Sequence, residues 1–126
     1  MKMDGMEVFN FVVRSVPKCL EYLMSEVSST PEDYDVLALH QANLFMVRQV
    51  AKKMKFPMEK VPTTIQKYGN SSSATIPVTL ASELHGHISS KKLKVLASGF
   101  GAGLSLASVS MELGPCHCPG VIEYEC

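Results

Sequence analysis

The sequence lacks an excess of charge of either sign, since 12 basic residues face 12 acidic ones. Without a net field, nothing draws the whole chain to nucleic acid or to an anionic membrane surface. The sequence also lacks an apolar run of membrane-spanning length, and its start has acidic residues where a signal peptide has an apolar core. These absences predict a protein that binds neither nucleic acid nor membranes and that carries no secretory leader.

Cysteine is also scarce, and most of it lies at one end of the chain. Cys19 stands alone, whereas Cys116, Cys118 and Cys126 fall together at the C-terminus. This spacing makes no disulfide framework and fits a reducing compartment, so we expect a cytoplasmic protein. The Cys-His-Cys motif at 116–118 offers metal-ligand types, but structural metal sites use wider spacings and a second pair of ligands. We therefore expect no metal site.

The remaining composition is that of a globular domain. The chain has 126 residues, of which 46% are hydrophobic and 19% are charged, an ordinary balance for a folded protein. That length is enough to bury a core without disulfides or metals. It corresponds to one domain, or to half of a larger one.

Charge is balanced overall but not along the chain. Residues 40–70 contain one acidic residue, Glu59, and six basic residues: Arg48, Lys52, Lys53, Lys55, Lys60 and Lys67. The simpler interpretation is a solvated helix face. The alternative is a surface that binds a phosphate-bearing or acidic partner, and the sequence leaves both open.

The spacing of apolar residues predicts alternating helices and strands. Helical steps predict a helix over 7–27 with a break at Pro17, a second from Asn43 to before Pro57, and a third over 71–84 that serines cap. Short apolar or alternating runs predict strands over 35–40, 94–100 and 104–113, an extended segment at 61–67, and an edge strand at 121–125. The two long strands would form a hairpin through residues 99–103. The expected fold is α/β, with one buried sheet between helices.

Three corners of this expected fold carry residues suited to chemistry. His40 ends a buried strand just before a helix, a place where ligands gather in α/β sheets. Asn70 lies in a turn, and the glycines at 99, 101 and 103 allow backbone N–H groups to approach a ligand. Each has a simpler interpretation, namely a core histidine, a turn asparagine and hairpin glycines. Only their combination favours a functional site.

That combination of motifs resembles a known family. "HQANLF" at 40–45, "YGNSSSATIPVTL" at 68–80 and "ASGFGAGLS" at 97–105 are similar to segments of the ketoacyl-acyl carrier protein synthase III enzymes, which are thiolase-like condensing enzymes. "MDGMEVFNFVVRSVPK" and "PMEKV" extend the resemblance over roughly residues 3–114. It implies one half of a five-layer α-β-α-β-α sandwich, with a mixed sheet flanked by helices. It also implies that residues 1–126 are the C-terminal domain and that the N-terminal half, with its nucleophilic cysteine, is absent.

For the site, the resemblance implies that His40 and Asn70 are catalytic. Both would donate hydrogen bonds to the thioester carbonyl of a malonyl group and stabilise the enolate that forms as carbon dioxide leaves. Backbone N–H groups near Gly101 and Ala102 would complete the oxyanion hole for the acyl group, and Phe100 would shield the nucleophile and gate decarboxylation.

Two further residues would bind substrate. Asn43 matches a position near the pantetheine arm. Where many relatives have a basic residue after "HQANL", this chain has Phe45, and Arg48, one helical turn further on, is the candidate substitute. No cofactor is implied beyond the phosphopantetheine thioesters of coenzyme A or acyl carrier protein, which are substrates.

The implied function is decarboxylative Claisen condensation of an acyl thioester with malonyl-acyl carrier protein, in fatty acid or related acyl or polyketide biosynthesis. The partners would be acyl-coenzyme A, malonyl-acyl carrier protein and the missing half, in a full enzyme that is a homodimer. The chain alone would be inactive, because none of its cysteines has a helix start or a histidine partner. One alternative is a non-catalytic subunit that pairs with a separate condensing-enzyme chain. A weaker one is a hydrolase or acyltransferase that does not condense its substrates.

Overall fold

The computed structural model describes residues 5–125 and places three strands in one mixed sheet. β1 (Val36–Leu39) runs parallel to β2 (Leu93–Gly101), which pairs antiparallel with β3 (Ser105–Leu113). β2 therefore lies in the middle, and the hairpin that it forms with β3 is the longest feature of the sheet.

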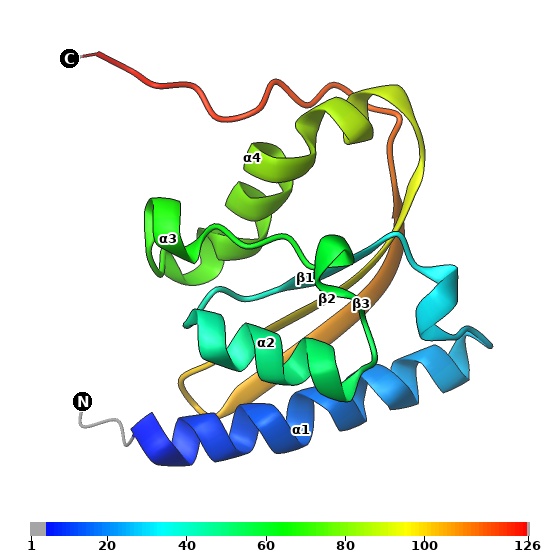
Figure 1. The fold of residues 1–126 in the computed structure, drawn as a ribbon, viewed down its shortest axis with the longest axis vertical. Coiled ribbons are helices and arrows are strands. Elements are labelled where there is room, and N and C mark those ends of the chain that lie inside the picture. The colour runs from blue at the N-terminus through cyan, green and yellow to red at the C-terminus, as the bar shows by residue number, and fades with distance from the viewer. Residues whose placement is uncertain (1–4, 126) are drawn as a thin grey trace.

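Helices cover both faces of this sheet. α1 (Gly5–Glu26) and α2 (Leu44–Lys53) lie on one side, and α4 (Thr75–Ser90) lies on the other (Figure 1). Short helical turns join these elements: α3 (Ile65–Tyr68) and the 3-10 turns Pro31–Asp33, Met58–Lys60 and Ser72–Ala74. The predicted α/β class, with a mixed sheet between helices, is confirmed.

Side chains alternate along β1 and β2 and so fill two cores. Those that pack with α1 and α2 are Leu37, Leu39, Leu96 and Phe100, and those that pack with α4 are Val36, Ala38, Val95 and Ala97. Every residue of β1 is buried, as expected for a parallel strand that is covered on both faces. The short apolar run at 35–40 is thus confirmed as a buried strand.

α1 continues through the predicted break at Pro17. Proline has no N–H, so the carbonyl of Val13, four residues earlier, has no helical donor. The Lys53 ammonium at the end of α2 donates to that carbonyl at 2.9 Å. A basic side chain thus replaces the missing backbone donor and links α1 to α2.

Two predictions about the middle of the chain are correct only in part. The segment expected to be extended at 61–67 becomes helical at Ile65, where α3 starts. α4 begins at Thr75, runs past residue 84 to Ser90, and has no side-chain cap. A 3-10 turn precedes it, and this turn already pairs the N–H groups of Ala74 and Thr75 with the carbonyls of residues 71 and 72. The serines therefore shape the entry to α4 through their backbone.

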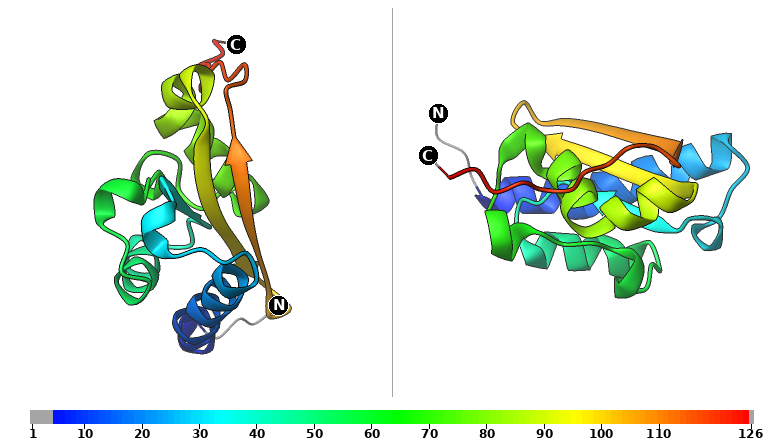
Figure 2. Two further views of the ribbon diagram at one scale, coloured as in Figure 1. Left: turned by 90° about the vertical axis from the view of Figure 1, so that its right-hand side faces the viewer. Right: turned by 90° about the horizontal axis from the view of Figure 1, so that it is seen from above.

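The predicted edge strand at 121–125 is also absent, because the tail after β3 follows α4 (Figure 2). Gly114 turns the chain with a φ of +87°, and a Cβ there would lie 2.5 Å from the carbonyl oxygen of Ile88. The Cys116 N–H donates to the same oxygen at 3.1 Å, and the Ser89 hydroxyl donates to the Cys118 carbonyl at 3.3 Å. Groups at the end of α4 thus hold the start of the tail, so it does not extend the sheet.

Removing the Lys53 ammonium should destabilise the fold. We expect Lys53→Ala to lower the free energy of unfolding by about 1 kcal/mol, because the Val13 carbonyl loses its donor. Lys52→Ala, on the exposed surface of the same helix, should change it by less than about 0.5 kcal/mol. Urea denaturation followed by circular dichroism measures both. Equal losses in the two variants would contradict the role given to Lys53.

Candidate active site

The three corners singled out in the sequence meet at one cavity. His40, Asn70 and residues 99–102 all line it, and its volume is about 680 Å³, within the range of small-molecule sites. The rest of its wall is apolar or small: Val8, Ala42, Ser72, Ser73, Thr75, Ile76, Ser105, Leu106 and Ala107. The wall therefore combines α1, the loop after β1, the entry to α4 and the β2–β3 hairpin.

Contacts from two other elements hold His40 at the end of β1. Its backbone N–H donates to the Ser98 carbonyl of β2 at 3.0 Å, which continues the parallel ladder by one residue. Its ring meets Phe100 edge to face, with centroids 5.0 Å apart and planes at 83°. Its Nδ1 lies 2.6 Å from the Thr75 hydroxyl at the start of α4. The ring is therefore oriented from both sides.

Burial favours the neutral form of this imidazole. The ring is half-buried, and loss of water disfavours its charged form, so the pKa of His40 is lowered from its ordinary value. Among the described residues that line the cavity, none carries a carboxylate that would oppose this effect. A neutral histidine can offer one N–H and one lone pair to the surrounding groups.

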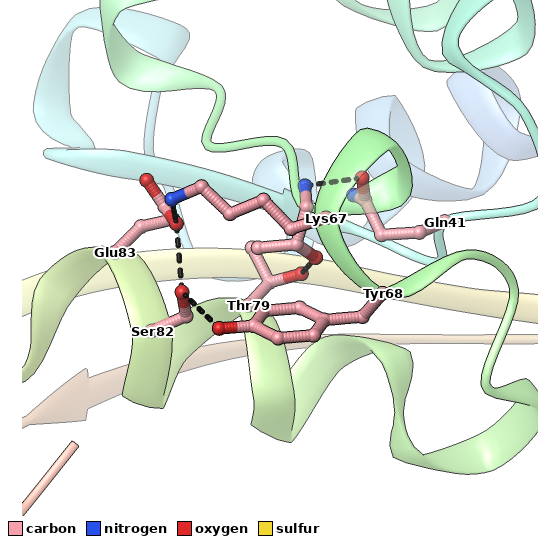
Figure 3. Close-up of polar contacts among 7 residues, drawn as sticks. Gln41, Lys67, Tyr68, Thr79, Ser82 and Glu83 are labelled. Atoms are coloured by element: carbon pink, nitrogen blue, oxygen red, sulfur yellow. Dashed lines mark hydrogen bonds and ion pairs between the residues drawn. The ribbon is translucent and has the colours of Figure 1, made fainter. Parts of the chain in front are cut away.

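The residue after His40 anchors the loop. Gln41 is fully buried; its Nε2 donates to the Leu39 carbonyl at 2.8 Å, and its Oε1 accepts from the Thr64 N–H at 3.1 Å. The Thr64 hydroxyl in turn lies 2.6 Å from that of Thr79 in α4. Figure 3 shows these contacts, which run from Gln41 to Thr79. Buried polar side chains thus tie the His40 loop to α4.

A second, exposed set of contacts joins α3 to α4. Lys67 pairs with Glu83, and Ser82 bonds both Glu83, at 2.8 Å, and the Tyr68 hydroxyl, at 3.4 Å (Figure 3). The hydrogen bond between Lys67 and Glu83 raises the pKa of the lysine and lowers that of the glutamate. These contacts fix α3, which leads directly into the turn that carries Asn70.

Asn70 lines the cavity from an exposed turn. Gly69 precedes it with a φ of +67°, a conformation that suits glycine. The Asn70 Oδ1 accepts the backbone N–H of Ser72 at 3.0 Å. With its oxygen engaged in this way, the side-chain amide still has its N–H groups to donate.

The hairpin contributes Phe100, Gly101 and Ala102 to the same wall. The predicted boundary is displaced here, because β2 extends through Gly99 and Gly101, which pair with Ala107 and Ser105. The turn itself starts only at Ala102. Two of the three glycines therefore belong to a strand, where they leave that side of the cavity without side chains.

The two residues predicted to bind substrate do not line this cavity. Asn43 caps α2, since its Oδ1 accepts the Met46 N–H at 2.8 Å. Arg48 lies exposed on α2. The basic residues around it are partly used by the fold: Lys53 contacts Val13, Lys60 donates to the Tyr34 carbonyl at 2.7 Å, and Lys67 pairs with Glu83. Three of the six basic residues at 40–70 are thus bonded within the fold itself.

Sequence reasoning missed the residues that hold the site together. Thr75, which contacts His40, lies within the "YGNSSSATIPVTL" motif, and Gln41 directly follows His40. A threonine in a serine-rich run and a glutamine in a loop carry no signal of their own. Val8 and Leu106 complete the wall but look like ordinary core residues of a helix and a strand.

Within residues 5–125, no three His, Cys, Asp or Glu side chains gather so as to hold a metal ion. No helix in the same range is both long enough and apolar enough to cross a membrane. Cys19, Cys116 and Cys118 are free thiols, and Cys126 lies outside the described residues.

The fold and this cavity define a class of protein. A 3-oxoacyl-(acyl-carrier protein) synthase from Burkholderia xenovorans LB400 superposes with a TM-score of 0.92 at 39% identity, over 97% of this chain and 35% of that one. A 3-oxoacyl-(acyl carrier protein) synthase III from Pseudomonas aeruginosa PAO1 superposes with a TM-score of 0.82 at 32% identity, over 89% of this chain and 35% of that one. The fold is that of the thiolase-like condensing enzymes, as the sequence motifs implied.

Sequence similarity gives the family. Residues 24–113 match the family described as 3-oxoacyl-[acyl-carrier-protein (ACP)] synthase III C terminal. The beta-ketoacyl-[acyl-carrier-protein] synthase III of Prochlorococcus marinus (strain MIT 9301) is 38% identical over 114 residues, which are 90% of this chain and 34% of that protein. The beta-ketoacyl-[acyl-carrier-protein] synthase III of Acaryochloris marina (strain MBIC 11017) is 45% identical over 106 residues, which are 83% of this chain and 32% of that protein. The chain belongs to the 3-oxoacyl-(acyl carrier protein) synthase III family, matches its C-terminal domain, and spans about a third of these relatives' length.

The lowered pKa of His40 can be tested by titration. We expect the ring protons of His40 to titrate, in nuclear magnetic resonance spectra, below the value of about 6.5 found in model peptides, because burial penalises the imidazolium. The unfolded chain then binds a proton at a higher pH than the folded chain does. Acidification from pH 6.5 towards the lowered pKa should therefore destabilise the wild-type chain more than a His40→Gln variant. Titration above 6.5 would show that a charged partner outweighs burial.

Proposed function

We propose that this domain provides the decarboxylation site of a synthase III-type condensing enzyme, whose nucleophilic cysteine comes from an N-terminal half. The full enzyme would join an acyl primer to a malonyl thioester with loss of carbon dioxide. The observation that carries this proposal is the convergence of His40, Asn70 and the hairpin on one cavity. Membership of the family supports it.

The reaction needs hydrogen-bond donors at one oxygen. When the bond from the malonyl carboxylate to its neighbouring carbon breaks, that electron pair moves onto the thioester and the carbonyl oxygen gains negative charge. A ring N–H of His40 and the amide of Asn70, fixed in a partly dry site, would stabilise this enolate. Its carbon then attacks the acyl group on the cysteine, and the thiolate leaves.

The hairpin would serve the other substrate. Gly101 and Ala102 line the cavity, and their backbone N–H groups are the proposed donors for the acyl carbonyl oxygen. Phe100, which contacts the His40 ring, would shield the cysteine and gate decarboxylation. Asn43 and Arg48, both exposed, are left for the pantetheine arm and its phosphates outside the cavity.

The proposed substrates are an acyl-coenzyme A and malonyl-acyl carrier protein, in fatty acid or a related biosynthesis. The phosphopantetheine thioester is the only group of this kind that the reaction requires, so we propose no separate cofactor. We further propose a homodimeric full enzyme in the cytoplasm, and the free thiols of Cys19, Cys116 and Cys118 fit a reducing compartment.

Loss of either donor should strongly slow decarboxylation but leave acylation intact. In the enzyme completed by an N-terminal half, we expect His40→Ala or Asn70→Ala to slow malonyl decarboxylation about 10²- to 10³-fold, because one donor to the enolate is lost. Asn70→Asp should be at least as harmful, since a carboxylate repels the developing charge. Cysteine acylation, followed by intact mass, should persist.

The matched control is Gln66→Ala, which removes a side-chain amide from exposed helix α3 away from the cavity. Its activity should equal that of the wild type. If the His40 and Asn70 variants instead lost acylation and kept decarboxylation, the role of both residues as donors to the enolate would be wrong.

The chain alone should carry no nucleophile for acyl transfer. After incubation with a short acyl-coenzyme A, we expect its intact mass to be unchanged, because none of the described residues lining the cavity is a cysteine. Addition of the N-terminal half should give one acyl adduct, on that half. A stoichiometric adduct on the isolated chain would require the mechanism to be rebuilt around one of its own cysteines.

A further inference from the structure

A single hydroxyl proton decides what His40 can offer to the cavity. The Thr75 hydroxyl lies 2.6 Å from Nδ1 of His40 and 3.0 Å from the carbonyl oxygen of Ser72. It has one proton for these two contacts. A neutral imidazole also has one ring proton, on Nδ1 or on Nε2. The position of the first proton therefore determines that of the second.

The two arrangements have opposite consequences. If Thr75 donates to the Ser72 carbonyl, its oxygen must accept from an Nδ1–H, and neutral His40 then presents a lone pair at Nε2. If Thr75 donates to Nδ1, the ring proton must lie on Nε2. The hydrogen bond of the ring to Thr75 is made through Nδ1, so Nε2 is the nitrogen left for a ligand.

Two observations favour donation to Nδ1. The contact with Nδ1 is the shorter of the two. The Ser72 carbonyl already accepts the backbone N–H of Thr75 and has no need of the hydroxyl. Thr75 is 2% exposed, so water cannot readily take the place of its hydroxyl at Nδ1.

We propose that Thr75 is a positioning residue that donates its hydroxyl proton to Nδ1 of His40 and thereby fixes the ring proton on Nε2. The role in catalysis rests on the function proposed above, because only there must His40 be a donor to the enolate. The tautomer itself is a property of the isolated chain. The two parts can therefore fail separately.

The first test measures the tautomer directly. In the chain labelled with ¹⁵N-histidine, long-range ¹H–¹⁵N correlation spectra distinguish a protonated ring nitrogen from one that accepts a hydrogen bond, and His40→Gln assigns the signals. Above the pKa of His40, we expect a proton on Nε2 in the wild type and in Thr75→Ser, which keeps the hydroxyl. Thr75→Val, which has the same shape but no hydroxyl, should give a mixture of tautomers.

The matched control is Thr79→Val, the same substitution one helical turn further along α4. Thr79 is equally buried and bonded to Thr64, but it makes no contact with His40. Its spectrum should retain the Nε2 proton. A wild-type ring protonated on Nδ1, or an unchanged tautomer in a folded Thr75→Val chain, would overturn the proposal. If Thr75→Val does not fold, the wild-type and Thr75→Ser spectra still decide it.

The second test measures the consequence in the enzyme completed by an N-terminal half. We expect Thr75→Val to lower kcat for malonyl decarboxylation by about 10-fold or more, with little change in KM, since the lost stabilisation acts on the enolate. Thr75→Ser should restore the rate. If Nε2 carries the proton but His40→Ala leaves decarboxylation unchanged, the proposed function fails while the tautomer assignment stands. If His40→Ala is inactive and Thr75→Val is fully active, the positioning role fails.

Discussion

The parallel pairing of β1 with β2 is the constraint on which the site depends. In a parallel pair the carboxyl ends of both strands reach the same edge of the sheet. Leu39 pairs with Ser98, and the His40 N–H donates to the Ser98 carbonyl. This register sets how far each strand extends beyond that edge. It brings the ring of His40 against Phe100. A shift of one residue would exchange the two faces of β1 and bury the wrong side chains in both cores.

The burial of β1, rather than its length, stabilises this register. A strand of four residues forms few ladder hydrogen bonds, but its side chains fill both cores at once. The loop after it is then fixed by polar groups, with Gln41 bonded to Thr64 and His40 to Thr75. Both contacts lead to α4, directly or through Thr79. The position of α4 thus affects the site although most of the helix lies away from it.

Patterns that depend on local physics were predictable from the sequence. Apolar runs gave the buried strand and the hairpin strands, and helical spacing gave α1, α2 and the existence of α4. Features decided by tertiary contacts were not predictable: the tail held by Ile88 and Ser89, and Lys53 as donor to Val13. The 3-10 entry that replaces a serine cap is local, but a serine-rich run is compatible with either start of a helix. The position of Asn70 and His40 on one cavity came from recognising a family pattern, since neither residue carries that information alone.

The partner of His40 bears on the chemistry as much as its position does. A carboxylate against Nδ1 would raise the pKa of the ring and favour an imidazolium, whereas a threonine hydroxyl adds no charge and leaves burial to dominate. In the proposed reaction the substrate begins with a full negative charge on its carboxylate and passes it to the thioester oxygen. A cation in the cavity would bind both states, and stabilisation shared by both does not accelerate the step. A neutral donor aimed at the thioester oxygen discriminates between them, because that oxygen gains its charge only as carbon dioxide leaves.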